Sequence, residues 1–151
     1  MLAVVQRVSS ASVTVGDRVL GSIGPGFLVL LGVMQGDDER QAEILSDRIC
    51  GLRVFNDAQG KMNLSLADVK GELLVVSQFT LGADVRRGRR PSFSNAASPE
   101  EGKRLYEHFC NCCAKLGFVV KTGEFGAMMK VALVNDGPVT ITFDSRIYPV
   151  R

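Results

Sequence analysis

The run Leu73–Val76 constrains the fold more than any other feature, because it places four apolar residues, two of them β-branched, in a row. Such a run predicts a strand buried on both faces, which we expect to extend to Leu81. Small hydroxyl and amide side chains follow at Ser77, Gln78 and Thr80. A strand that ends in such residues brings hydroxyls and backbone N–H groups to a rim that a ligand can reach. An ordinary strand end with a turn after it explains the same pattern, so both interpretations stay open here.

The size and composition are those of one domain, residues 1–151, with a sizeable hydrophobic core. The net charge of +2 does not indicate a nucleic-acid binder, so any such contact has to come from a local cluster of charge. No apolar run approaches the roughly 20 residues that cross a bilayer, and residues 1–7 lack the regions of a signal peptide. We therefore expect a cytoplasmic protein without membrane contact.

The hydrophobic pattern predicts about nine strands and two long helices. The first helix is expected at residues 39–52, where apolar residues recur at spacings of three and four. The second is expected to begin at a Ser98 cap and to end near Leu116, with Leu116 on the buried face and Tyr106 on the exposed face. Two β-rich runs near the end, 128–134 and 139–143, flank a Gly-Pro bend.

This order favours an α/β fold of mixed sheets packed together, with the helices on one side, over a doubly wound nucleotide fold. Neither G-x-G-x-x-G nor a P-loop motif occurs, so no phosphate-loop cofactor is expected. The four cysteines fall on the two predicted helices, too close together on the second to form a disulfide framework. With His108 as the only histidine, a zinc site would lack ligands, and reduced thiols are expected instead.

Side-chain catalysis lacks a base in this chain. Thr80 and Ser77 supply hydroxyls, but His108 falls in mid-helix, where a catalytic role is not expected. Asp84 follows the strand end, where a carboxylate more often forms a turn. What is left is main chain: N–H groups at Phe79 and Thr80 can stabilise a developing oxyanion. A reactive ester with its own activating group, such as a neighbouring ribose hydroxyl, would then need little else.

A basic segment follows the candidate strand end. Arg86, Arg87, Arg89 and Arg90 lie within five positions, with glycine among them and Pro91 after them, so no packed element is expected. A solvated loop is the simplest interpretation. Its closeness to the candidate site favours a role facing the phosphates of a nucleic acid.

Two short segments resemble the paired signatures of the D-aminoacyl-tRNA deacylases, also called D-tyrosyl-tRNA(Tyr) deacylases. Ser77–Leu81 reads S-Q-F-T-L, and Asn135–Thr140 reads N-D-G-P-V-T. Gln6–Val8, Lys61–Leu64 and Arg90–Phe93 match further motifs of that family in the same order. The resemblance therefore covers nearly the whole chain.

The resemblance implies a homodimer of three-layer β/β/α subunits that cleaves the ester joining a D-amino acid to tRNA, without a cofactor. Such an enzyme would have to reject L-amino acids by their side chains. Glycine has no side chain to reject, so mischarged glycyl-tRNA is a further expected substrate. Gly137-Pro138 would have a cis peptide bond and project into the partner's pocket, where its carbonyls hold the substrate's amino group. Arg7 would brace this turn, and Met129 would line its surroundings.

In the same family, the main chain at Phe79 and Thr80 would bind the terminal adenosine and the ester, and the ribose 2′-hydroxyl would assist hydrolysis. Ser77 and Gln78 complete this candidate catalytic segment, and the Thr80 hydroxyl as nucleophile is the second choice. Gly82 stands where members often carry a larger side chain, and residues 86–90 hold more arginine than expected. These two departures bear on pocket shape and tRNA preference.

Two other classes of function remain open from the residues alone. A non-catalytic RNA-binding dimer would use the loop at residues 86–90, and would tolerate changes at Gly137-Pro138. A thiol-dependent hydrolase would use Cys110, Cys112 or Cys113 as nucleophile, and alkylating agents would inactivate it.

Overall fold

A computed structural model describes residues 1–148 of the chain. Its main sheet has six strands in the order β2-β1-β3-β6-β7, with β8 paired to the other side of β1. These strands are β1 (Leu2–Val15), β2 (Arg18–Ile23), β3 (Gly26–Gly32), β6 (Glu72–Ser77), β7 (Val120–Thr122) and β8 (Lys130–Asp144). A separate two-stranded sheet contains β4 (Phe55–Asn56) and β5 (Met62–Leu64). The helices are α1 (Glu39–Cys50) and α2 (Pro99–Lys115), with short 3₁₀ turns η1 (Phe79–Gly82) and η2 (Ser145–Ile147).

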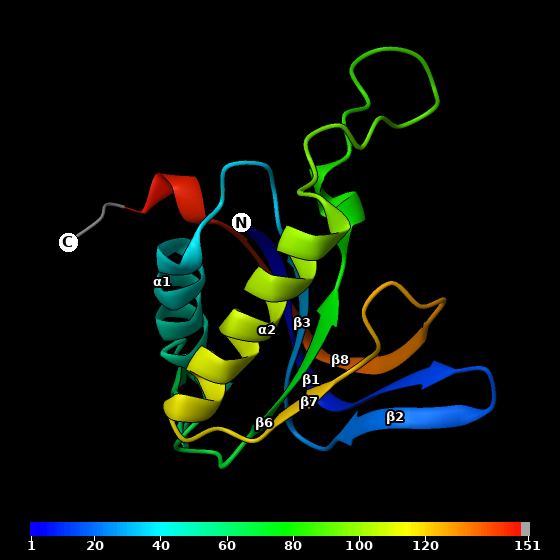
Figure 1. The fold of residues 1–151 in the computed structure, drawn as a ribbon. Coiled ribbons are helices and arrows are strands. Elements are labelled where there is room, and N and C mark those ends of the chain that lie inside the picture. The colour runs from blue at the N-terminus through cyan, green and yellow to red at the C-terminus, as the bar shows by residue number, and fades with distance from the viewer. Residues whose placement is uncertain (149–151) are drawn as a thin grey trace.

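The elements form the three layers that the sequence predicts. Both helices lie side by side over one face of the central strands (Figure 1), and the larger hydrophobic core lies between them and the sheet. A second core lies on the opposite face and includes Val13, Leu28 and Leu74. There β2 packs closely across the sheet. A Cβ at Gly21 would lie 3.2 Å from Leu74 Cδ1 and 2.9 Å from the Thr122 carbonyl oxygen, so only glycine allows this approach. The buried run of β6 is therefore covered by helices on one face and by strands on the other.

Both helices begin at a capping side chain, and the Ser98 cap that the sequence predicts is confirmed. The Asp38 carboxylate accepts from the backbone N–H of Gln41 while the Gln41 side chain accepts from the backbone N–H of Asp38, which is a capping box. Ser98 caps α2 by accepting from the N–H of Glu101. Two side-chain predictions on α2 are wrong. Tyr106 is buried, because its hydroxyl finds the Val75 carbonyl at 2.7 Å, and Leu116 is 48% exposed just beyond the last turn.

The predicted strand over residues 73–81 is correct only in its first part. The strand β6 ends at Ser77, and the chain then turns into η1. The reason lies in the neighbouring strand, since the last residue of β3 that pairs with β6 is Leu31, opposite Ser77. Beyond that pair β6 has no ladder partner to continue with.

The two strands predicted around the Gly-Pro bend form one interrupted strand, β8. Both parts pair with β1, from Lys130 opposite Thr14 to Asp144 opposite Leu2. Between the pairs of Gln6 with Thr140 and Val8 with Asn135, one residue of β1 faces the four residues 136–139. The extra residues bulge out as a loop, and because the two predicted strands form one, residues 1–148 contain eight strands instead of about nine.

No helix within residues 1–148 is long and apolar enough to cross a membrane.

Candidate active site

The candidate catalytic segment leaves the core at the end of β6 and forms the turn η1. The N–H of Gln78 is still held by the Leu31 carbonyl at 2.8 Å, so the entry to the turn is fixed to β3. Phe79 and Thr80 follow on the surface, with Phe79 54% exposed. Their N–H groups open the turn, where no acceptor exists inside the turn itself, and no side chain caps it. The segment therefore presents main-chain donors on a rigid support.

The Thr80 hydroxyl has an amide neighbour rather than a base. It accepts a hydrogen bond from Gln78 Nε2 at 2.6 Å. His108 lies elsewhere, between the two helices, with its Nε2 atom 3.5 Å from a Glu43 carboxylate oxygen. In the part of the chain that the structure describes, no imidazole or carboxylate is hydrogen-bonded to this hydroxyl. The hydrogen-bond partner that the structure gives this hydroxyl is therefore the Gln78 amide.

A cavity of about 260 Å³ opens beside Ser77 and Phe79. Its other lining residues are small or apolar and come from the residue after β3, the segment that leads into α2, the first turn of α2 and the loop before β8: Val33, Ala96, Ala97, Ser98, Pro99, Gly102, Phe125 and Gly126. The exposed Phe79 ring stands edge-on to Phe93, with 5.1 Å between ring centroids. A flat apolar group can therefore enter next to the main-chain donors of η1.

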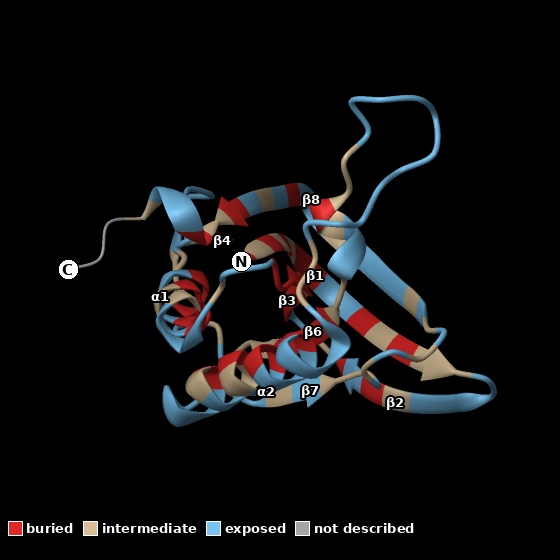
Figure 2. Cartoon of the chain, turned by 45° about the horizontal axis from the view of Figure 1, so that its top comes forward, coloured by how far each residue is buried: buried red, intermediate tan, exposed pale blue. Residues whose placement is uncertain are grey.

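The basic loop projects from the body of the protein just after η1 (Figure 2), and all four of its predicted arginines are exposed. Its base is tied by two backbone hydrogen bonds between Asp84 and Ser92, at 2.8 and 2.9 Å. Arg86 folds back onto Asp84 with N–O distances of 2.9 and 2.6 Å, and its guanidinium lowers the pKa of the Asp84 carboxyl to about 2. Arg86 is therefore neutralised locally, whereas Arg87, Arg89 and Arg90 carry the charge of the loop outward.

The second signature segment forms the loop inside β8. The Gly137-Pro138 peptide bond is cis, and Gly137 has a φ of +139°, a conformation that side chains other than glycine rarely adopt. Arg7 is 6% exposed and reaches the loop from β1, donating from Nε to the Asp136 carbonyl at 2.8 Å. It also donates from Nη1 to the Val54 carbonyl at 2.6 Å. The structure thus brings Arg7 to the Gly-Pro segment.

Asn135 is a residue of this loop that the sequence reasoning did not single out. Its side-chain oxygen accepts from the N–H of Val139 at 3.0 Å, and its amide donates to Thr140 Oγ1 at 2.9 Å. The side chain therefore closes the loop across its mouth while Gly137 and Pro138 stay exposed. The position of Asn135 as the first residue of the N-D-G-P-V-T segment was the available signal, since asparagine side chains often close turns.

Met129 lies in a different place. A Cβ at Gly123 would lie 2.5 Å from Met129 Sδ and 3.3 Å from Val13, so these residues share the second core. Its expected position around a Gly-Pro turn stays a prediction. The two signature segments are also apart within one chain, because β1 and β3 lie between β8 and β6 in the sheet.

Comparison with known proteins decides the family. Residues 4–144 match the family model described as D-Tyr-tRNA(Tyr) deacylase. The chain belongs to this family. Similar relatives are a D-aminoacyl-tRNA deacylase of Roseiflexus sp. (strain RS-1), 60% identical over 98% of this chain and 96% of the relative, and one of Thermosipho melanesiensis, 58% identical over 97% of this chain and 98% of the relative.

Two solved structures share the fold of this D-Tyr-tRNA(Tyr) deacylase family member. The c-Myc DNA unwinding element binding protein has a TM-score of 0.90 and 42% identity, and the match covers 99% of this chain and 100% of that one. A probable eukaryotic D-amino acid tRNA deacylase has a TM-score of 0.78 and 18% identity, covering 94% of this chain and 97% of that one. At that identity the second likeness concerns the fold alone.

The thiols of this deacylase family member lie between its helices, away from both signature segments. All four cysteines are free, with Cys50 and Cys113 buried. Cys110 and Cys113 have the C-x-x-C spacing, yet their surroundings oppose ionisation. Burial raises the pKa of Cys110 to about 12, and contact with Cys50 raises the pKa of Cys113. Burial also raises the pKa of Cys112, so the predicted shortage of an activating partner is matched by the pKa directions. Over residues 1–148, no group of three or more His, Cys, Asp or Glu residues could hold a metal ion.

Proposed function

We propose that this chain hydrolyses the ester bond of D-aminoacyl-tRNA, releasing free amino acid and tRNA, and that it also cleaves glycyl-tRNA. Its membership of the deacylase family supports the reaction. The observation that carries the proposal is the pair of exposed main-chain donors at Phe79 and Thr80, with no side-chain base bonded to the Thr80 hydroxyl among residues 1–148. Glycine is included because a filter that rejects an L side chain has nothing to reject on glycine.

The chemistry proposed at η1 needs no ionisable side chain. Water attacks the ester carbonyl, and the N–H groups of Phe79 and Thr80 donate to the oxygen that becomes negative. A donor of this kind contributes roughly a hundred- to a thousandfold in rate. The ribose 2′-hydroxyl next to the ester assists the attack of the water, which gives up a proton. The bond between the carbonyl carbon and the ribose 3′ oxygen then breaks, and the 3′ oxygen leaves with a proton. The apolar cavity beside Ser77 and Phe79 receives the terminal adenosine.

We further propose that the active site is completed by a second copy of the chain. Within one chain β1 and β3 separate the Gly-Pro loop from η1, so a loop that reaches η1 must come from a neighbour. The free edge of β8 exposes Leu133 and Val134, which suits a contact between copies. In this homodimer the carbonyls of Gly137 and Pro138 hold the substrate's amino group and leave no room for an L side chain.

We propose that the basic loop at residues 86–90, called the arginine loop below, binds the tRNA backbone. Arg87, Arg89 and Arg90 are exposed beyond η1, and three cations beside the ester site suit the phosphates near the end of an acceptor stem. Arg86 contributes less to this contact, because Asp84 already neutralises it.

A paired assay tests the proposed function. One tRNA is charged with the D and the L form of the same amino acid. For each ester, the rate of hydrolysis with the protein is divided by the spontaneous rate, and the two ratios are compared. We expect the D ester to be cleaved much faster and glycyl-tRNA to be cleaved as well. Equal rates on both enantiomers would refute the chiral filter, and no acceleration of either ester would refute the reaction.

A second candidate is a nucleic-acid-binding dimer without turnover. The observation that favours it is the similarity to a structure described as a DNA unwinding element binding protein, together with the exposed arginines. This candidate predicts binding of uncharged RNA or DNA that is indifferent to substitution of Gly137. The assay above separates the two, since only the first candidate predicts ester cleavage.

A further inference from the structure

The segment at residues 33–37 lies between β3 and α1 and contacts two parts of the candidate active site, the turn η1 and the stretch that carries Phe93. On one side it holds the strand-like stretch that carries Phe93. Met34 pairs with Ala96, the Gln35 N–H donates to the Asn95 carbonyl at 2.9 Å, and the Gln35 side chain donates to the Ser94 carbonyl at 2.7 Å. The position of the Phe93 ring, and hence its edge-on contact with Phe79, depends on this segment.

On its other side the same segment supports η1 through the Met34 side chain. Met34 is buried, and its thioether fills the space left by two glycines. A Cβ at Gly82, the last residue of η1, would overlap Met34 Sδ and lie 2.9 Å from Met34 Cε. A Cβ at Gly32 would lie 3.1 Å from Met34 Cε and 2.9 Å from the Gln78 carbonyl. The Met34 thioether therefore packs directly against the turn, and a Cβ added at Gly82 requires either the end of the Met34 side chain or η1 to shift.

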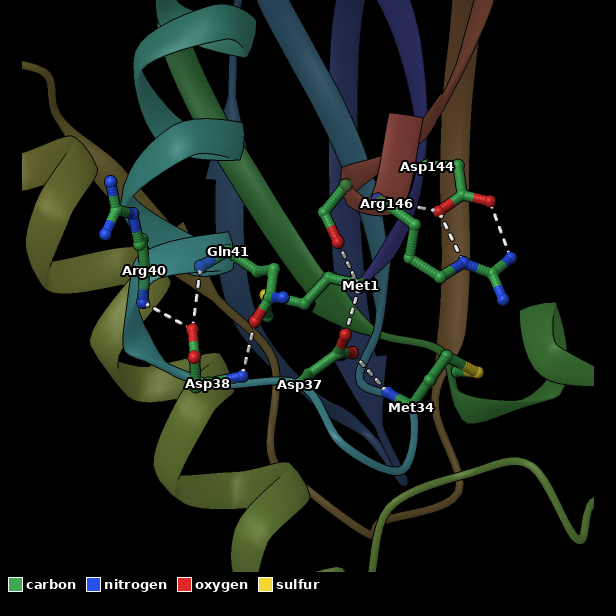
Figure 3. Close-up of polar contacts among 9 residues, drawn as sticks. Met1, Met34, Asp37, Asp38, Arg40, Gln41, Asp144 and Arg146 are labelled. Atoms are coloured by element: carbon green, nitrogen blue, oxygen red, sulfur yellow. Dashed lines mark hydrogen bonds and ion pairs between the residues drawn. The ribbon is translucent and has the colours of Figure 1, made fainter. Parts of the chain in front are cut away.

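The backbone of Met34 is anchored in turn (Figure 3). Its N–H donates to Asp37 Oδ2 at 2.6 Å, and the other oxygen of that carboxylate accepts from the Met1 ammonium group at 2.5 Å. The Met1 ammonium also donates to Ser145 Oγ. The Asp37 side chain is only 4% exposed, so a buried ion pair fixes the backbone of Met34, and only the Met34 side chain can move when the turn presses on it.

We infer that Met34 is a positioning residue for the deacylase site, with Gly82 as its matched partner. Its side chain sets the distance of η1 from the residue 33–37 segment, and therefore the direction of the Phe79 and Thr80 N–H groups. Its backbone sets the position of the segment that carries Phe93. This inference rests on the proposed function of η1. It adds a buried residue that touches neither tRNA nor ester.

Three variants and a control test the coupling. Gly82→Ala is expected to lower kcat for D-aminoacyl-tRNA at least tenfold, with KM for tRNA changed less than threefold, because η1 moves while the arginine loop does not. The double variant Met34→Ala/Gly82→Ala is expected to regain at least fivefold in kcat over Gly82→Ala, because the overlap is removed. Met34→Ala alone is expected to fall between wild type and Gly82→Ala. Gly24→Ala is the control, since a Cβ there meets nothing within 4 Å.

The outcomes separate positioning from mere stability. If Met34 only fills the core, the two losses add and the double variant is worse than either single one, which would overturn the inference, as would full kcat in Gly82→Ala. Melting temperatures confirm that each variant is folded at the assay temperature. Should Gly82→Ala not fold, Met34→Leu decides, because leucine conserves volume but lacks the terminal methyl that contacts Gly32. A threefold or larger loss of kcat supports the inference and an unchanged kcat refutes it. Absence of turnover in wild type would instead refute the proposed function.

Discussion

The turn η1 and the cysteines between the helices make an instructive pair. The cysteines have the more reactive side chains, but η1 has the more accessible polar groups. The cluster holds all four cysteines, the strongest nucleophiles of the chain, yet burial raises the pKa of Cys110 and Cys112, and the contact with Cys50 raises the pKa of Cys113. The turn holds no ionisable group, yet it exposes main-chain donors at the rim of a cavity. The comparison teaches that local packing can oppose ionisation of a reactive side chain, while the end of a strand can bring main-chain groups to the surface.

The physical reason lies in how each region meets the core. The helices bury the faces they turn to the sheet, as Figure 2 shows, and the small polarisable thiols fill space there as apolar residues do. The strand β6 is buried on both faces up to Val76, and then loses its partner and emerges at once. A rigid support and an exposed end lie within a few residues of each other, which favours preorganised donors.

The largest effect is expected from removing a main-chain donor of η1. Thr80→Pro deletes one N–H, and we expect a loss of about a hundredfold or more in kcat. Thr80→Ala keeps the N–H and loses only the hydroxyl, so it is expected to stay within about tenfold of wild type. Single-turnover hydrolysis of D-aminoacyl-tRNA measures both, with melting curves to show that the proline variant is folded. The reverse order would make the hydroxyl the nucleophile.

A somewhat smaller effect is expected at the Gly-Pro loop. In Gly137→Ala the new Cβ would lie 2.8 Å from Val139 Cγ2 and 3.0 Å from Arg7 Nη2, at a φ of +139° that alanine rarely adopts. We expect the loop to shift, and the ratio of D to L hydrolysis rates to fall by about tenfold, the effect of roughly 1.4 kcal/mol. Parallel assays with both enantiomers measure this ratio. A ratio equal to that of Gly24→Ala would remove the loop from the filter.

The arginine loop is expected to affect binding and not the chemical step. Arg89→Gln with Arg90→Gln should raise KM for tRNA several-fold, and lower the slope of log KM against log salt by more than one unit, because two phosphate contacts are lost. The matched control is Arg146→Gln, since Arg146 is already paired with Asp144 at 2.8 and 2.6 Å. Titrations at several salt concentrations measure the slope. Equal slopes for the two variants would exclude a phosphate contact.

The smallest effect is expected from the thiols. Because the pKa of Cys110 is raised to about 12, this thiol stays protonated at pH 7.5 and becomes a thiolate only as the pH rises toward that value. We expect iodoacetamide at pH 7.5 to leave kcat within about twofold, and any labelling of the buried thiols to increase with pH. Mass spectrometry and activity are followed on the same samples. Inactivation in proportion to labelling of Cys110 or Cys112 would revive the thiol-dependent hydrolase.

Much of the fold follows from local pattern, because the patterns here agree with the packing. The apolar run before Ser77 and the caps at Asp38 and Ser98 each specify an element without help from distant residues. The turn η1 could not be predicted, because the sequence around Phe79 suits a strand and only the loss of a partner strand ends it. The burial of Tyr106 likewise depends on a carbonyl from another element.

The candidate site divides in the same way. The arginines at residues 86–90 are exposed and Arg7 contacts the Gly-Pro loop, whereas Phe79 and Thr80 lie on a turn and not on the expected strand, and the roles of these residues stay predictions. The role of Asn135 and the support of η1 by Met34 were missed, because both depend on contacts across the fold. The separation of the two signatures by β1 and β3 is a property of topology that no local motif contains.

The register of β1 has a consequence for how this protein can change. Ala3 and Val5 are buried in the larger core, and Arg7 stands two residues further along the same strand, where it reaches Asp136 and Val54. A slip of one position would send all three side chains to the opposite surface together. An insertion or deletion that shifts β1 by one position would therefore disrupt both the core and the contact of Arg7 with the Gly-Pro loop.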